Sequence, residues 1–105
     1  MRELSIDLLS ELLDKYGQDE QLRQAQGECG ELIAVIQNYH RAEKYGHRSE
    51  KLADVMSEAV DVYFMIQQIM VMDITMFNQM CLLKELKVLR KLDTEKPKRK
   101  KRTIK

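Results

Sequence analysis

The chain has 105 residues, of which 44% are hydrophobic and 33% charged, with one proline and four glycines. This length allows one compact domain, and the composition excludes a disordered or collagen-like chain. The net charge of +1 is divided unevenly, because the last ten residues carry seven Lys or Arg and no acid, against 11 basic and 17 acidic residues before them. We therefore expect one domain over residues 1–95 and a basic tail over residues 96–105.

The first half of the chain predicts two helices. Leucines recur at helical spacing over residues 5–15, and Gly17 is placed to end that helix. A second helix is predicted over residues 19–44, with Asp19 as its N-cap and Gly46 as its stop. Its expected buried stripe is made of Leu22, Ala25, Cys29, Leu32, Ile33, Ile36 and Tyr39.

The second half predicts two more helices. A turn over residues 46–49 leads to a third helix over residues 50–72, with Ser49 as its N-cap. A fourth helix is predicted over residues 75–92, and Pro97 marks its outer limit. The expected buried stripe of the third helix is made of Leu52, Val55, Ala59, Val62, Tyr63, Ile66, Ile69 and Met70.

Two pairs of acids, Glu28 with Glu31 and Glu58 with Asp61, lie at the edges of the second and third stripes. Residues three apart on a helix point to nearly the same side, so two neighbouring helices would gather four carboxylates around one point. A hard divalent cation such as Mg²⁺ compensates the repulsion among them. Asp54, one turn before Glu58, is an additional candidate ligand. The alternative is that these acids are ordinary solvated charges.

Other features of the sequence predict the packing around Gly30, the state of the cysteines and the location of the protein. Gly30 costs about 1 kcal/mol in mid-helix, which predicts close approach of another helix or of a ligand. Cys29 and Cys81 fit neither a zinc site nor a disulfide framework, and we expect both to be reduced and buried. No apolar run approaches ~20 residues and the N-terminus lacks signal-peptide character, so we expect a cytoplasmic protein without a membrane span.

The acid pairs and their surroundings, "QLRQAQGECGELI" and "SEAVDVYFMI", resemble the MazG-like nucleotide pyrophosphohydrolases of the all-α NTP pyrophosphatase group. The likeness covers roughly residues 21–92. That family's motif is usually written EExxE, then a spacer, then ExxD. Gly27 occupies the position where many members have the first Glu, which leaves the four inner acids intact.

The resemblance implies a four-helix, bundle-like MazG-type fold that is completed by oligomerisation, as a homodimer or homotetramer. It also implies hydrolysis of a nucleoside triphosphate to the monophosphate and pyrophosphate, with Mg²⁺ as cofactor and Mn²⁺ as a possible substitute. Carried over, the metal ligands are Glu28, Glu31, Glu58 and Asp61, and Glu31 or Glu28 activates the attacking water.

The phosphates and the base of such a substrate need further partners. Lys84 and Arg41 are candidate phosphate contacts, and Gln24 is a candidate contact to the base. A di-iron bundle is disfavoured, because His40 and His47 form no Glu-x-x-His pair. The alternative function is a non-enzymatic helical adaptor whose basic tail binds nucleic acid or a protein.

Overall fold

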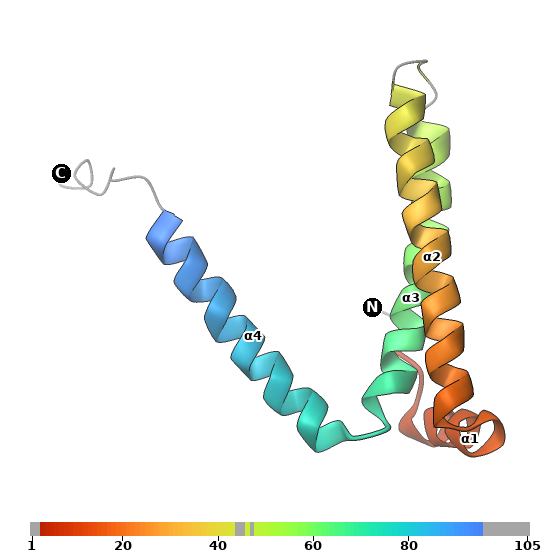
Figure 1. Ribbon diagram of the computed structural model, residues 1–105, viewed down its shortest axis with the longest axis vertical. Coiled ribbons are helices and arrows are strands. Elements are labelled where there is room, and N and C mark those ends of the chain that lie inside the picture. The colour runs from red at the N-terminus through yellow and green to blue at the C-terminus, as the bar shows by residue number, and fades with distance from the viewer. Residues whose placement is uncertain (1–2, 44–45, 47, 96–105) are drawn as a thin grey trace. The chain divides into compact units, whose positions relative to one another are not determined.

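A computed structural model describes residues 3–43, 46 and 48–95, which form four α-helices and no strand (Figure 1). The helices are α1 (Ile6–Tyr16), α2 (Gln18–Glu43), α3 (Arg48–Met70) and α4 (Ile74–Glu95). The predicted all-α class is confirmed. Lys44, His47, Pro97 and the basic tail lie outside the described residues.

Gly17 alone separates α1 from α2. Its φ of 83° lies in the region that favours glycine, and its N–H donates to the Leu13 carbonyl at 2.8 Å, so it ends α1 as predicted. Its own carbonyl accepts from the Gln21 N–H at 3.1 Å, which starts α2 at Gln18. Asp19 therefore lies inside the first turn of α2, and its prediction as the N-cap was wrong.

The other helix ends differ from the predictions by a few residues. α3 begins before Ser49, so Ser49 does not cap it. α4 continues to Glu95, and the Thr94 hydroxyl donates to the carbonyls of Arg90 and Lys91 in its last turn. Such differences arise because several neighbouring residues can serve as caps.

α2 and α3 lie side by side along their lengths and form an antiparallel hairpin (Figure 1). On each helix, one series of buried and half-buried residues recurs at alternating steps of four and three, the spacing of a helix–helix contact. We call these residues the seam. On α2 they are Gln21, Ala25, Glu28, Leu32, Val35, Tyr39 and Ala42, and on α3 they are Lys51, Val55, Glu58, Val62, Met65 and Ile69.

On α2 the buried surface is narrower than the predicted stripe. Ala25, Leu32 and Tyr39 are at least half-buried as expected, but four members of the α2 stripe are exposed: Leu22, Cys29, Ile33 and Ile36. Leu52 and Ile66 of the α3 stripe are exposed as well, whereas the other six members of that stripe are half-buried as expected. A hairpin covers only one side of each helix, so apolar residues on the next side stay uncovered within the chain.

α1 packs against both long helices at the end of the hairpin where α2 begins (Figure 1). Leu9 from α1 is fully buried. The Leu4 N–H donates to the Gln67 side-chain oxygen at 2.7 Å, which ties the segment before α1 to α3. Gln21, Gln67 and Gln68 are buried in the hairpin unit, so part of its packing is polar.

α4 belongs to a separate unit that begins at Ile74, after a connection of three residues. None of its residues is buried. No single helix among the described ranges is long and apolar enough to cross a membrane, and α3 and α4 meet that test only when counted together as a bent pair. Cys81 on α4 is exposed, as is Cys29 on α2, so the prediction that both are buried was wrong.

Candidate metal centre

The hairpin brings together acids from both predicted pairs. Glu28, Glu31 and Glu58 each offer a carboxylate oxygen, and these three atoms all lie within 4.8 Å of one another. Glu28 and Glu58 are seam residues, whereas Glu31 is exposed beside them. We call these three residues the acid cluster. The sequence placed Glu28 and Glu58 at the edge of the buried stripe, but the structure places them inside the helix contact.

The spacing of the acid cluster suits a small divalent cation. Mg²⁺ binds oxygen at 2.0–2.1 Å, so two oxygens on opposite sides of an octahedral ion are about 4.2 Å apart. Oxygens within 4.8 Å of one another therefore need only a small movement of flexible Glu side chains to contact one ion. All the donors are carboxylate oxygens, the ligands that Mg²⁺ and Mn²⁺ prefer over softer metals.

Two of these carboxylates have oxygens that lack a partner. The Oε1 atoms of Glu28 and Glu58 are buried and accept no hydrogen bond. A buried carboxylate oxygen without a donor loses its hydration and gains nothing in return. A bound cation would satisfy both atoms, so the residues present fit the metal that the sequence pattern predicts.

The pKa shifts within the acid cluster also fit a bound cation. Burial raises the pKa of the Glu28 carboxyl above its ordinary 4.5, and the charges of Glu31 and Asp61 raise it further. Burial also raises the pKa of Glu58, followed by the charges of Glu31, Asp61 and Glu28. A hydrogen bond with Glu31 adds to the rise in the Glu58 pKa, because a shared proton needs one protonated partner.

These shifts predict how the stability of the metal-free chain depends on pH. A carboxyl whose pKa is higher in the folded state binds protons more tightly there, so folding is favoured at low pH. The free energy of unfolding should fall as pH rises from about 4.5, the ordinary value, through the raised pKa values of Glu28 and Glu58. Thermal melts in EDTA between pH 4.5 and pH 8 measure this trend.

If the acid cluster is the metal site that the sequence predicts, saturating Mg²⁺ should remove most of that decline, because a bound ion would favour the ionised carboxylates. The matched control is the same pH series with Glu28→Gln and Glu58→Gln combined, which should lack both the decline and the Mg²⁺ effect. A metal-free stability that rises across this pH range would contradict the assignment.

Asp61 stands just outside the acid cluster, close enough for its charge to act on both Glu28 and Glu58. Gln24 and Asp54 lie one turn before Glu28 and Glu58, respectively, and both are exposed. Each sits one position before a seam residue, as Glu31 and Asp61 do. Gln24, Glu31, Asp54 and Asp61 therefore lie on the same side of the hairpin, the side on which the acid cluster meets solvent.

The remaining candidates lie elsewhere. Arg41 is ten positions beyond Glu31 on α2, about 15 Å along the helix axis, and is exposed. Lys84 is exposed on α4, in the second unit. Gly30 has nothing within 4 Å of the position where a Cβ would be, so its predicted close neighbour is not supplied by the described part of this chain.

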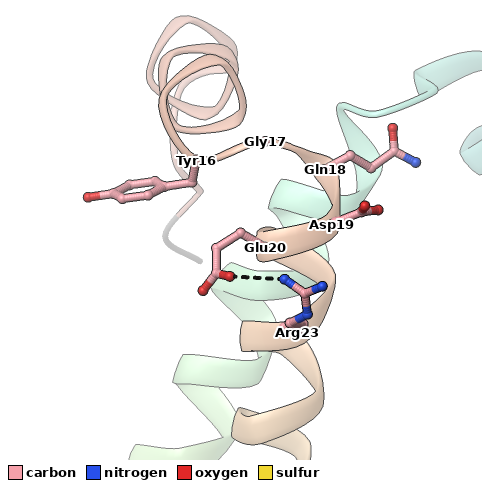
Figure 2. A pocket seen from close by; sticks show the side chains of 6 residues that line it. All are labelled: Tyr16, Gly17, Gln18, Asp19, Glu20 and Arg23. Carbon is pink, nitrogen blue, oxygen red and sulfur yellow. Dashed lines mark ion pairs between the residues drawn. The ribbon is translucent and has the colours of Figure 1, made fainter.

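A surface hollow of about 690 Å³ lies at the junction of α1 and α2, separate from the acid cluster. Figure 2 shows its lining residues around Gly17, with an exposed ion pair between Glu20 and Arg23 at 3.5 Å. Arg23 is five positions before Glu28, about 7 Å along the helix axis. The hollow has no group of acids in metal-binding positions, and we assign it no role.

The sequence did not indicate the buried glutamines. Gln21 is almost completely buried, yet its polar side chain kept it out of the predicted stripe. The signal that could have found it is the four-and-three spacing, because Gln21, Ala25 and Glu28 continue one seam.

A comparison of the chain with protein-family models, curated proteins and solved structures found no match.

Proposed function

We propose that the chain is a Mg²⁺-dependent nucleotide pyrophosphohydrolase, which cleaves a nucleoside triphosphate to the monophosphate and pyrophosphate. The observation that carries the proposal is the acid cluster, in which two helices contribute converging carboxylates with unpartnered buried oxygens. An acid cluster alone is compatible with several metal-dependent reactions. The sequence pattern around Glu28, Glu31, Glu58 and Asp61, with its MazG-like resemblance, selects this one.

Each acid has a distinct part in the proposed reaction. Glu28 and Glu58 hold the metal from within the seam, where packing fixes their side chains. Glu31 and Asp61 complete the ligand set from the face of the hairpin that meets solvent. The bound metal supplies charge neutralisation for the triphosphate and lowers the pKa of a coordinated water.

Glu31 is the best-placed base for that water. Its carboxylate is exposed, so a substrate can reach it from solvent, whereas Glu28 and Glu58 are half-buried in the seam. Water adds its oxygen to phosphorus, its proton passes to the Glu31 carboxylate, and the bond between the α- and β-phosphates breaks. The products are a monophosphate and pyrophosphate, so the atoms of water and substrate are all accounted for.

Gln24 and Asp54 flank the opening of the acid cluster and are the nearest side chains available to orient the substrate or water. Lys84 and Arg41 remain candidate phosphate contacts. For Lys84, this proposal requires α4 of this chain or of another copy to approach the acid face of the hairpin.

The test is an assay for pyrophosphate release from a panel of ribo- and deoxyribonucleoside triphosphates, with Mg²⁺, with Mn²⁺ and with EDTA. We expect release in either metal, none in EDTA, and equal amounts of monophosphate and pyrophosphate. Release of inorganic phosphate with a diphosphate would contradict cleavage between the α- and β-phosphates. Silence across the panel from folded protein would favour the helical adaptor.

A further inference from the structure

The second half of α4 separates apolar from basic side chains. At about 100° per residue, two sets of positions fall on opposite sides of the helix, each within about half a turn. The apolar side consists of Cys81, Leu82, Leu86, Val88, Leu89 and Leu92. The basic side consists of Lys84, Lys87, Arg90 and Lys91. Two residues depart from this division, because Glu85 lies on the apolar side and Leu83 lies on the basic side.

The described part of this chain covers neither side of the helix. All residues in the range 81–92 are exposed, with Leu82 57% and Leu89 54% exposed. Several large apolar side chains in contact with water are unfavourable, so a continuous apolar side of this kind marks a contact surface. The partner of α4 therefore offers apolar atoms, and it also tolerates four cations on the same helix.

The basic tail directly follows this half of α4. It carries seven Lys or Arg and no acid, and it begins immediately after α4 ends at Glu95. The tail adds to the four cations of the basic side, so positive charge is concentrated in this last part of the chain. The partner is therefore anionic as well as apolar.

We propose that α4 binds the surface of an anionic lipid bilayer, with its apolar side among the acyl chains and its basic side at the headgroup phosphates. A basic amphipathic helix lies in the plane of the membrane interface, where buried apolar area and attraction to anionic lipids both contribute to affinity. The proposal goes beyond the proposed hydrolysis and does not depend on it. It gives Lys84 a second candidate partner besides the phosphates of a substrate.

Charge and side-chain type together favour a bilayer over a nucleic acid. Clusters of four to eight Lys or Arg on an amphipathic helix are typical of segments that bind anionic lipids. A nucleic acid would also attract the cations, but its bases stack on aromatic side chains. Residues 81–105 contain no Phe, Tyr or Trp, and the apolar side is mostly aliphatic. Acyl chains accept such side chains, whereas a nucleic acid leaves them in water.

Cosedimentation of the full chain with phosphatidylcholine vesicles, with and without phosphatidylserine, gives the first test. We expect binding at least about tenfold tighter with phosphatidylserine, because each cation near an anionic surface raises the affinity about fivefold. Leu82→Gln should weaken binding about tenfold, since it removes an aliphatic side chain from the apolar side and keeps a good helix former. Leu83→Gln is the matched control, because Leu83 is equally exposed but lies on the basic side.

Two results of this assay would overturn the proposal. One is the failure of folded wild-type protein to bind either kind of vesicle. The other is an equal loss of affinity in Leu82→Gln and Leu83→Gln, which would mean that the apolar side does not enter the bilayer.

A gain of binding guards against variants that merely unfold α4. Glu85→Gln removes the one acid from the apolar side, so it should tighten binding to phosphatidylserine vesicles about fivefold. An unchanged affinity would contradict the assignment of this side to the membrane.

The two cysteines give a further test that leaves the other side chains of α4 intact. Cys81 lies on the apolar side and Cys29 lies on α2, and both are exposed. Alkylation by a water-soluble reagent is followed at Cys81 in Cys29→Ser and at Cys29 in Cys81→Ser. We expect phosphatidylserine vesicles to slow the reaction of Cys81 about tenfold and to leave that of Cys29 unchanged.

The same alkylation assay distinguishes the other occupants. Slowing of Cys81 by duplex DNA or RNA, without any effect of vesicles, would identify a nucleic acid as the partner. Slowing that follows protein concentration in the absence of lipid would mean that another copy of the chain covers α4. Each of these results rejects the bilayer.

Discussion

Under the proposed function, Glu58→Gln should lower metal-dependent pyrophosphate release by about 100-fold or more, because it removes a proposed metal ligand that lies in the seam. The same substitution should raise the melting temperature of the metal-free chain. An amide has almost the same shape as a carboxyl group but carries no charge, so it relieves the repulsion that raises the pKa of Glu58 and Glu28. Activity and stability should therefore change in opposite directions.

Opposite changes in activity and in melting temperature distinguish a functional site from a structural one. A Glu that merely helped the hairpin to fold would lose stability and activity together. The measurements are pyrophosphate release at saturating Mg²⁺ and melting temperature in EDTA and in Mg²⁺. Glu11→Gln is the control, because Glu11 is an exposed acid on α1 outside the acid cluster. Retention of full activity by Glu58→Gln would show that the assigned ligand set is wrong.

Leu9→Ala should cost about 2–4 kcal/mol of unfolding free energy, the largest effect on stability expected outside the acid cluster. Leu9 is the one fully buried large apolar side chain among the described residues, with 0% of its surface exposed. Its loss leaves a cavity where α1 packs against the hairpin. The hairpin unit has few buried apolar residues, so little other packing can compensate.

Urea denaturation followed by helical circular dichroism measures this effect, at one fixed protein concentration because any assembly adds to stability. The midpoint should fall while the dependence on urea stays constant. Leu8→Ala is the matched control, since Leu8 precedes Leu9 on α1 but is 42% exposed, and it should change stability by less than about 1 kcal/mol. Equal effects of the two substitutions would mean that α1 is not anchored by Leu9.

The helices themselves could be predicted from the sequence, because apolar spacing and glycine positions are local signals. Gly17 ends α1 as expected, since few other residues adopt its φ. The convergence of acids from two helices was also predictable. Each pair has the same spacing from its apolar stripe, so packing of the two stripes turns both pairs toward one side of the hairpin, and the structure brings Glu28, Glu31 and Glu58 together there.

The side on which the helices meet could not be predicted, because each apolar stripe is wide enough for two contacts. Cys29 and Ile33 belong to the stripe on α2 as clearly as Leu32 does, yet only Leu32 lies in the seam. Polar seam residues such as Gln21 added to the ambiguity, because the spacing of apolar residues does not identify them as buried. The position of Glu28 inside the contact, with its unpartnered oxygen, follows from that choice and appeared only in the structure.

Placing ionisable side chains in the seam has a consequence for how the hairpin folds. Most seam residues stabilise the contact between α2 and α3. Glu28 and Glu58 instead repel each other whenever both are ionised, which weakens the contact at their layer. The hairpin thus carries local frustration at this layer, which lowers the free energy of opening there. A cation bound at that layer would link α2 to α3, so metal binding would also rigidify the hairpin.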